Sequence, residues 1–245
     1  MWSGEGGSGQ VMFTRDQYEL LDVGHGRRLE RFGAFVLDRP APAAETMSVH
    51  NRAIWSAADA YFERRSAPHG VWTFRQDMPP SWLLKHGPFQ MELRCAPSGA
   101  VGVFPEQADN WDWIAEQTVA ANRPLKVLNL FAYTGGSTLA AAAAGASVVH
   151  VDAARSVVDW ARQNAQRSGL ENAPIRWITE DARKFVRREA RRGAQYDGVI
   201  LDPPSYGHGP KSQAWKFQEH LADLLVALRQ LVGAKTAFVL LTCHT

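Results

Sequence analysis

Asp202-Pro203-Pro204-Ser205-Tyr206 is the most specific chemical motif in this 245-residue chain. Two consecutive prolines fix the backbone dihedrals and remove two amide donors. A rigid row of carbonyl acceptors is then left beside the Asp202 carboxylate, and the Tyr206 ring can stack on a planar substrate. The motif follows an apolar run, so we predict that it faces a substrate at the end of a strand.

Three earlier segments carry residues suited to a ligand that contains a nucleoside. In NLFAYTGGS (129–137), Gly135 and Gly136 permit a sharp turn and a close approach to a ligand. A helix then begins, and the free amides of its N-terminus point at that ligand. Asp152 ends the next strand, where a carboxylate can accept both hydroxyls of a ribose. Asp181, in EDA, follows a third strand and can accept from an adenine amino group.

Each of these aspartates has a plainer interpretation, because Asp152 or Asp181 can simply cap the helix that follows it. A nicotinamide cofactor is a rival for the same strand ends. Its G-x-G-x-x-G fingerprint is absent, since residues 133–138 read YTGGST.

Four segments, NLFAYTGG, VVHVDA, EDA and LDPPSY, resemble successive motifs of the class I S-adenosylmethionine-dependent methyltransferases. They resemble most the bacterial branch that includes the large-subunit ribosomal RNA cytosine-C5 methyltransferases. GVFPEQADNW (102–111) is similar to the segment that, in that branch, precedes the Rossmann-like domain and closes over the cofactor. The resemblance covers 101–242 and implies S-adenosylmethionine as cofactor, methyl transfer as activity and ribosomal RNA as partner.

The resemblance also implies roles for single residues. The loop 129–135 wraps the amino-acid part of the cofactor, Asp152 holds the ribose and Asp181 holds the adenine amino group. The implied cofactor set is Phe104, Gln107, Asn129, Phe131, Ala132, Tyr133, Thr134, Gly135, Asp152, Ala153, Asp181, Ala182 and Asp202. The implied acceptor-facing set is Asp202, Pro203, Pro204 and Tyr206.

Two departures from the family pattern bear on the substrate. The glycine-rich turn lacks the G-x-G-x-G of many methyltransferases. The acceptor motif, DPPSY at 202–206, is one residue longer than the D-P-P-Y of enzymes that methylate exocyclic amines, because it contains Ser205. The longer motif argues against an amine acceptor. The region before Ser98 shows no clear match to the RNA-binding domain usual in the branch.

Cys243, in LLTCHT, is the candidate nucleophile for cytosine chemistry. A thiolate that adds to C6 makes C5 able to attack a methyl group. Strand five neighbours strand four in a doubly wound sheet, at about 4.8 Å, so Cys243 and Asp202 are expected to flank one pocket. A buried structural cysteine is the open alternative, and we expect His244 to be a bystander.

Other functions stay open at this stage. They are methylation of an exocyclic amine, methylation of a non-RNA substrate, and a non-catalytic module that binds cofactor or RNA. The DPPSY motif argues against the last of these, because a pure binder has no need of an acceptor site. A basic segment, with Arg183, Lys184, Arg187, Arg188, Arg191 and Arg192, either contacts phosphates or is a solvated helix face.

Alternating strands and helices must position these residues. Apolar runs at 126–131, 147–152, 175–179, 196–202 and 237–242 alternate with helical patterns at 137–145, 156–169, 182–193 and 214–233, after a helix at 111–122. This alternation predicts an α/β fold with a Rossmann-like, doubly wound parallel sheet covered on both faces. The family sheet has seven strands, so we expect a fragment of a longer protein whose fifth strand is an apolar edge.

A smaller β-rich region is expected before this domain. Strands are predicted at 18–23, 27–33 and 35–40, and a hairpin is predicted to join 89–97 to 100–106 through Ser98-Gly99. The dense aromatic residues of 55–89 indicate a core, with a base-stacking platform as the alternative. We therefore divide the chain into a tail (1–14), a β-rich region (15–105) and a cofactor-binding domain (106–245).

Composition excludes several classes of protein. Apolar residues make up 45% and charged residues 21% of the chain, as in globular domains. The net charge of +2 does not by itself indicate nucleic-acid binding. Two distant cysteines predict neither a disulfide framework nor a metal site, and favour the cytoplasm. No membrane-spanning run or signal peptide is expected, and the sequence does not indicate an oligomeric state.

Overall fold

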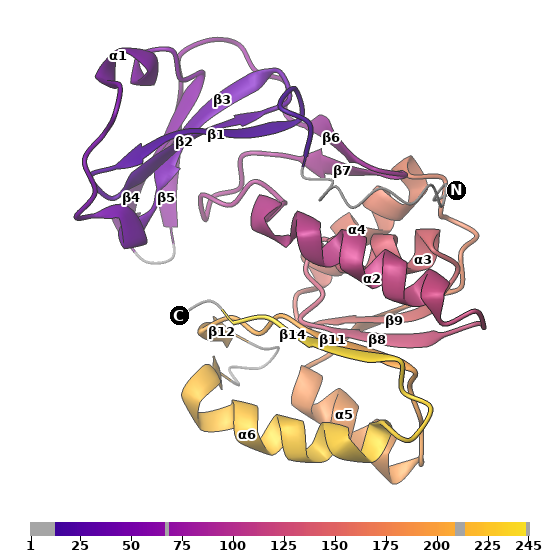
Figure 1. Ribbon diagram of the computed structural model, residues 1–245. Coiled ribbons are helices and arrows are strands. Elements are labelled where there is room, and N and C mark those ends of the chain that lie inside the picture. Colours follow the sequence, from indigo (N-terminus) through magenta and orange to yellow (C-terminus); the bar gives the residue numbers. More distant parts are fainter. Residues whose placement is uncertain (1–12, 67–68, 209–213, 244–245) are drawn as a thin grey trace. The chain divides into compact units, whose positions relative to one another are not determined.

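The computed structural model describes residues 13–66, 69–208 and 214–243 (Figure 1). The chain forms two compact units, with the boundary between Ala108 and Asp109. We describe each unit by itself. Within the described ranges, no helix has the length and apolar character needed to cross a membrane.

The first unit contains a mixed five-stranded sheet and an antiparallel pair of strands. Its larger sheet has the order β1-β2-β3-β4-β5, in which only the β3–β4 pair is parallel. The strands are β1 (Tyr18–Gly24), β2 (Arg27–Phe32), β3 (Phe35–Pro40), β4 (Ala60–Ser66) and β5 (His69–Phe74), and the short helices are η1 (Pro42–Ala44), α1 (Arg52–Trp55) and η2 (Pro105–Gln107). Phe62 and Phe89 are fully buried, which supports the core interpretation of this aromatic region.

The predicted hairpin through Ser98-Gly99 is wrong. The strand β7 (Phe89–Leu93) pairs instead with β6 (Trp82–His86), in a register that runs from Trp82–Leu93 to His86–Phe89. The two strands meet at Gly87, whose φ of 50° suits the tight turn. Ser98-Gly99 is a turn, but the segment after it makes only isolated backbone bonds, such as Arg94 N to Val101 O at 3.1 Å.

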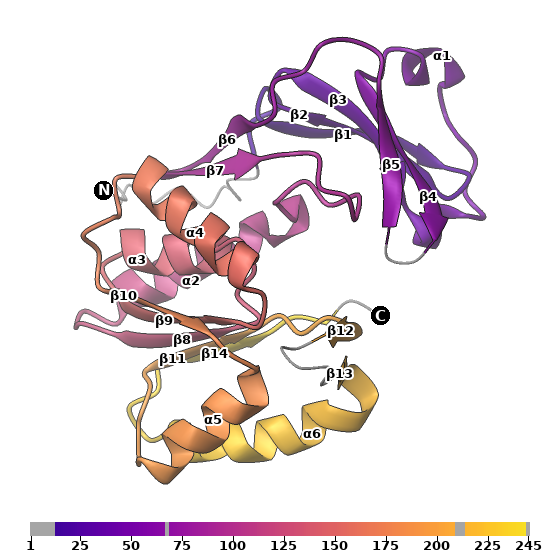
Figure 2. The same cartoon turned by 180° about the vertical axis from the view of Figure 1, so that it is seen from behind.

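The second unit is a five-stranded parallel sheet in the order β10-β9-β8-β11-β14. The strands are β8 (Lys126–Leu130), β9 (Ser147–Asp152), β10 (Ile175–Thr179), β11 (Gly198–Leu201) and β14 (Phe238–Leu241). Helices α2 (Ala108–Ala120), α3 (Gly136–Ala143) and α4 (Arg155–Arg167) cover one face, and α5 (Ala182–Arg191) and α6 (Phe217–Leu228) cover the other (Figure 2). The predicted doubly wound sheet is confirmed.

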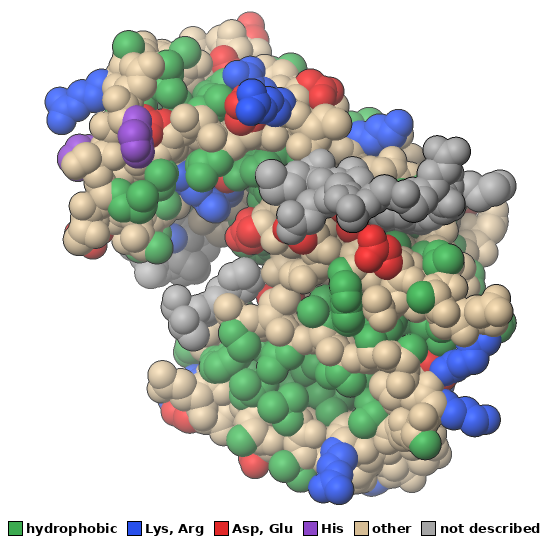
Figure 3. All heavy atoms as spheres, viewed as in Figure 1, with side chains coloured by type: hydrophobic (Ala, Val, Ile, Leu, Met, Phe, Trp, Pro, Cys, Tyr) green, Lys and Arg blue, Asp and Glu red, His purple; other side chains and the backbone are tan. Residues whose placement is uncertain are grey.

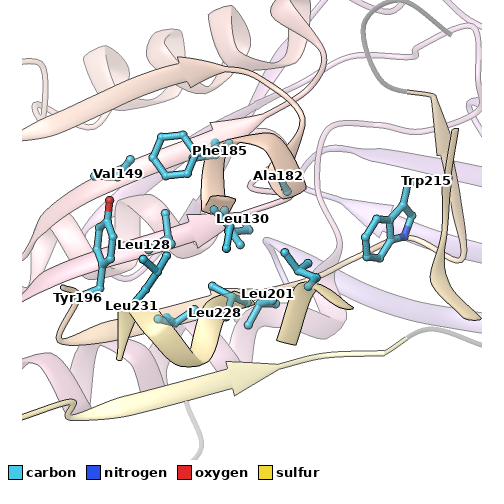
Figure 4. Packing of buried hydrophobic residues seen from close by; sticks show 14 residues of the cluster. Leu128, Leu130, Val149, Ala182, Phe185, Tyr196, Leu201, Trp215, Leu228 and Leu231 are labelled. Atoms are coloured by element: carbon cyan, nitrogen blue, oxygen red, sulfur yellow. The ribbon is translucent and has the colours of Figure 1, made fainter. Parts of the chain in front are cut away.

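Side chains that alternate between the two faces of each strand form two separate hydrophobic clusters, one on each face of the sheet. Leu128 and Leu130 on β8 point toward α5 and α6, and they share a cluster with Phe185 and Leu228 (Figure 4). Val127, one residue before Leu128, belongs to the cluster on the opposite face. Successive side chains of a strand point to opposite faces, so strands buried on both sides read as continuous apolar runs.

The predicted helix at 214–233 begins too early. Ala214–Lys216 forms the short strand β13, which pairs with β12 (Tyr206–His208), and α6 starts only at Phe217. The short helix η3 (Arg229–Leu231) follows α6. This small ribbon holds the acceptor motif against the start of α6.

β14 is the outermost strand of the described sheet, as expected for the fifth strand. Val239 is 54% exposed and Leu241 37%, and Figure 3 shows hydrophobic side chains gathered where β14 and α6 lie. The edge is therefore apolar, as the sequence predicts.

Candidate cofactor and acceptor site

The loop after β8 has an unusual backbone. Phe131 and Tyr133 adopt left-handed conformations, with φ of 56° and 49°, and Gly135 has φ of 97°. Large side chains rarely adopt such values, because the conformation costs free energy. The loop is therefore a place where the fold maintains strain at the carboxyl end of the central strand.

Neighbouring elements hold this loop in place. Ala132 N donates to Val151 O at 3.1 Å, so the loop is tied to β9. The side-chain amide of Asn164, buried on α4, donates to Thr134 O at 2.9 Å. Sequence reasoning missed Asn164, whose signal is a polar residue on the apolar face of a helix.

The two glycines at the start of α3 serve different needs. Gly135 is the N-cap residue, and no side chain caps the helix N-terminus. Gly136 lies against the Trp111 indole, where an added Cβ would be 2.4 Å from a ring atom. The close approach at Gly136 is thus to Trp111, while the N-terminal amides of α3 suit an anionic group such as the carboxylate of an amino acid.

Asp152 joins two of the loops at the strand ends. Its Oδ2 accepts from Tyr133 N and its Oδ1 from Ala154 N, both at 2.9 Å. It does not cap α4, since Ala154 is the N-cap residue and makes no side-chain cap bond. Burial raises the pKa of the Asp152 carboxyl, and the backbone bonds oppose this rise. Each oxygen keeps a lone pair that can accept from a ribose hydroxyl.

Asp181 does act as a helix cap. Its side chain accepts from Lys184 N at 3.1 Å, and Arg183 lies 3.5 Å from its other oxygen. The adjacent Glu180 is paired with Arg188 at 2.5 Å. Asp181 therefore has a structural role, and its predicted contact with an adenine amino group stays a prediction.

A buried chain of polar side chains lies behind the loop. Asn129 Nδ2 donates to Thr138 Oγ1 at 2.9 Å, and Thr138 Oγ1 lies 3.0 Å from His150 Nδ1. All three residues are almost fully buried. Burial lowers the pKa of His150 to about 3, with a further contribution from Arg162. Asn129 thus has a partner inside the unit, and its predicted contact with the cofactor stays a prediction.

The ends of β11 and β14 bring the acceptor motif to Cys243. Leu201 and Leu241 are register partners, and Thr242 Oγ1 donates to Asp202 Oδ1 at 2.5 Å. Cys243 is the next residue and is exposed in the part of the chain that the structure describes. Pro203 is buried, whereas Tyr206 is 53% exposed.

Trp215 links the two loops, and sequence reasoning missed it. Its Nε1 donates to Pro204 O at 2.7 Å, and its ring centroid lies 4.8 Å from that of Phe131. The indole is 4% exposed and lies at the end of the core cluster, beyond Leu201 in Figure 4. The loop after β8 and the acceptor motif after β11 therefore contact one side chain.

The structure thus gathers most predicted site residues at one edge of the sheet, because the carboxyl ends of parallel strands meet there. Ala153 is half-buried beside Asp152, and Ala182 is buried in the core. Phe104 and Gln107 belong to the first unit, so their part in the site stays a prediction. An uncapped helix N-terminus and a carboxylate with spare acceptors fit the amino-acid and ribose parts of the expected cofactor.

Comparisons of sequence agree with this geometry. The sequence profile of the S-adenosylmethionine-dependent methyltransferases matches residues 68–239. Ribosomal RNA large subunit methyltransferase I of Aeromonas salmonicida is 36% identical over 129 residues, which are 52% of this chain and 29% of that protein. Ribosomal RNA large subunit methyltransferase K/L of Shewanella frigidimarina is 32% identical over 109 residues, which are 44% of this chain and 15% of that protein. The chain thus spans less than a third of the length of either relative.

Solved structures show the same fold. A SAM-dependent methyltransferase from Agrobacterium tumefaciens is similar, with a TM-score of 0.86 and 41% identity over 90% of this chain and 70% of that one. A second protein, described as a methyltransferase and complexed with SAH, has a TM-score of 0.73 at 18% identity, over 92% of this chain and 60% of that one. At that identity the second likeness concerns the fold alone.

Proposed function

Because the chain belongs to the family of S-adenosylmethionine-dependent methyltransferases, we propose that it methylates a base of large-subunit ribosomal RNA, with C5 of a cytosine as the acceptor. The names of the matched relatives support ribosomal RNA as the substrate. The expected place of action is the cytoplasm, where that RNA is assembled into ribosomes.

The residues after β8 and β9 hold the cofactor in this proposal. The N-terminal amides of α3 bind its carboxylate, and Asp152 accepts from its ribose hydroxyls. Asp152 also fixes the Tyr133 backbone, so the carboxylate both contacts the cofactor and shapes the loop around it. When bound, the cofactor supplies an electrophilic methyl group carried on a positively charged sulfur.

Residues after β11 and β14 act on the base. The Tyr206 ring stacks on the cytosine, and the Asp202 carboxylate accepts from its exocyclic amine. The Cys243 thiolate adds to C6, and the electron pair of the C5–C6 double bond moves to C5. C5 then bonds to the methyl carbon as the bond from that carbon to the cofactor sulfur breaks, with its electron pair left on the sulfur. C5 then loses its proton to a base, the C6–S bond breaks, and the pair returns to sulfur.

One observation carries the choice of cytosine C5. Thr242 is hydrogen-bonded to Asp202, and the next residue is an exposed cysteine. A carboxylate and a thiol at the ends of adjacent strands suit an acceptor that needs a nucleophile on its ring. An amine acceptor needs only the carboxylate and the carbonyl groups of the acceptor motif.

RNA that contains 5-fluorocytidine tests this proposal. Fluorine at C5 cannot leave as a proton, so the parent protein should be trapped as a covalent adduct with the RNA. Cys243→Ala should abolish both the adduct and turnover, and should leave cofactor affinity unchanged. Nucleoside mass spectrometry of the methylated RNA identifies the product independently.

Cys95→Ala is the matched control. Cys95 is the other cysteine, it lies in the first unit, and burial raises the pKa of its thiol to about 11. This variant should form the adduct like the parent. An active Cys243→Ala variant, with no adduct from the parent, would refute the cytosine assignment. Asp202 would then be the main catalytic candidate.

A further inference from the structure

A groove between α5 and α6 carries a row of basic side chains. The two helices pack side by side on one face of the sheet (Figures 1 and 2). The groove is lined by Glu180, Lys184, Arg187, Arg188, Ala190, Arg191, Ala227 and Gln230. Positions 184, 187, 188 and 191 follow the i, i+3, i+4, i+7 spacing of one helix face. The row therefore follows the groove instead of encircling the helix.

Most of this positive charge is uncompensated. Of the four cations, Arg188 is paired with Glu180, the one carboxylate in the lining. Among the described residues, no carboxylate forms an ion pair with Lys184, Arg187 or Arg191, and all three are exposed. Asp223, on α6, lies outside the lining. Like charges at these spacings repel one another, so the row disfavours the helix that carries it unless an anion is bound.

The opposite face of α5 packs against the sheet and anchors the helix to the core of the unit. Phe185 and Val186 are buried in the core cluster, and the buried Glu189 accepts from Tyr196 and pairs with Arg192. Packing, a buried hydrogen bond and the ion pair of Arg188 with Glu180 therefore hold α5 in place without the other three cations of the row. The side chains of Lys184, Arg187 and Arg191 are not needed for the architecture of this unit.

The groove begins at the same sheet edge as the candidate site. Glu180 and Asp181 directly follow β10, and Lys184 lies in the first turn of α5. From Lys184 to Arg191 the helix rises about 10 Å, which is roughly three phosphate-to-phosphate steps along one strand of a nucleic acid.

We propose that this groove binds the phosphate backbone of the RNA substrate, in a segment next to the methylated base. This inference rests on the proposed function. Lys184, Arg187 and Arg191 each contact a phosphate, and Arg188 stays paired with Glu180. The contacts carry no base specificity, since phosphates position a nucleic acid and base edges specify it.

The test compares a triple variant with a charge-matched control. Lys184→Gln, Arg187→Gln and Arg191→Gln together remove three charges from the groove. Arg155→Gln, Arg162→Gln and Arg167→Gln remove three exposed charges from α4, on the other face of the sheet. Binding of a fluorescein-labelled fragment of large-subunit ribosomal RNA is measured by anisotropy over a salt series, and cofactor binding is measured by calorimetry.

Counterion release gives the expected size of the effect. Three phosphate contacts on single-stranded RNA contribute about 2 to the slope of log K against log salt concentration. The groove variant should lose that slope, and its affinity at about 0.15 M salt should fall up to about 50-fold. The α4 variant should keep the parent's slope and affinity, and both variants should bind the cofactor as the parent does.

Three results would overturn the inference, and they differ in what they say of the proposed function. If the parent binds the RNA and the groove variant does so with equal affinity and slope, the groove is not the phosphate site, while the RNA substrate stands. If the parent binds the cofactor but no RNA, the inference and the proposed substrate both fail. Binding of the groove to vesicles of phosphatidylserine, without binding to RNA, would also count against it.

Discussion

His150 makes the stability of the second unit depend on pH. Its imidazole is fully buried on β9, and its pKa is lowered to about 3. The unfolded chain takes up this proton near pH 6.5, so the unfolded state binds more protons than the folded state between these two values. The contribution of His150 to the free energy of unfolding therefore falls as the pH is lowered below about 6.5, at about 1.4 kcal/mol per pH unit.

The expected loss follows from this slope. Between about pH 7.5 and about pH 5, His150 alone should lower the free energy of unfolding by about 2 kcal/mol. His150→Asn keeps a polar partner for Thr138 and removes the titrating group. The variant should be less stable than the parent near neutral pH, because it packs less well, and its stability should depend less on pH.

Pulsed hydrogen–deuterium exchange over a urea series measures this effect. Exchange is read on the peptide that contains β9, so that the first unit does not contribute. His220→Asn, on α6 of the same unit, controls for the loss of an imidazole. Equal losses of free energy in the parent and in His150→Asn on acidification would refute the reasoning.

Three further predictions concern the end of β9 and the segment that follows β8. Asp152→Ala should weaken cofactor binding by about 1–3 kcal/mol, because two ribose hydroxyls lose their acceptor; calorimetry that finds equal affinities would remove Asp152 from the site. Since burial raises the pKa of Asp152, the parent's cofactor affinity should fall as acidification protonates this carboxyl, and Asp152→Asn should lack that dependence. Gly136→Ala should lower the free energy of unfolding by about 1–3 kcal/mol, since its Cβ meets the Trp111 ring. Combined with Trp111→Leu it should cost less than the sum of the two changes, and additive losses in thermal denaturation would contradict the contact.

The parallel sheet could be predicted from the sequence because a strand buried on both faces has apolar residues at successive positions. The runs that become β8 and β9 carry apolar residues on both faces, a loop with glycine follows β8, and an aspartate ends β9 at the site edge. Residues that follow such strands lie together at one edge of the sheet, even when the predicted bounds of the strands are off by a residue or two. Asp152 and Asp202 could therefore be assigned to one edge before the register was known.

Other parts of the site are not indicated by any local pattern in the sequence. Phe131 and Tyr133 adopt conformations that their side chains disfavour, and only the tertiary bonds of the loop compensate. Trp215 fits the helical spacing of α6, so its pattern hides the short strand that brings it to Pro204. His150 lies within an apolar run, and nothing local indicates that its partner is Thr138, twelve positions earlier.

The strand order also has a consequence for synthesis on the ribosome. The central strand β8 is made first, and β9 and β10 then add in turn on one side of it. The other edge of β8 stays unpaired until β11 is made. Asp197 directly precedes β11 and accepts from Lys126 N at the start of β8, and it comes 71 positions after Lys126. At roughly 5–20 residues per second, this interval lasts roughly 4–14 s. For that time a nascent half-sheet offers an open, apolar pairing edge, so this stretch of translation is when the chain is most exposed to mispairing.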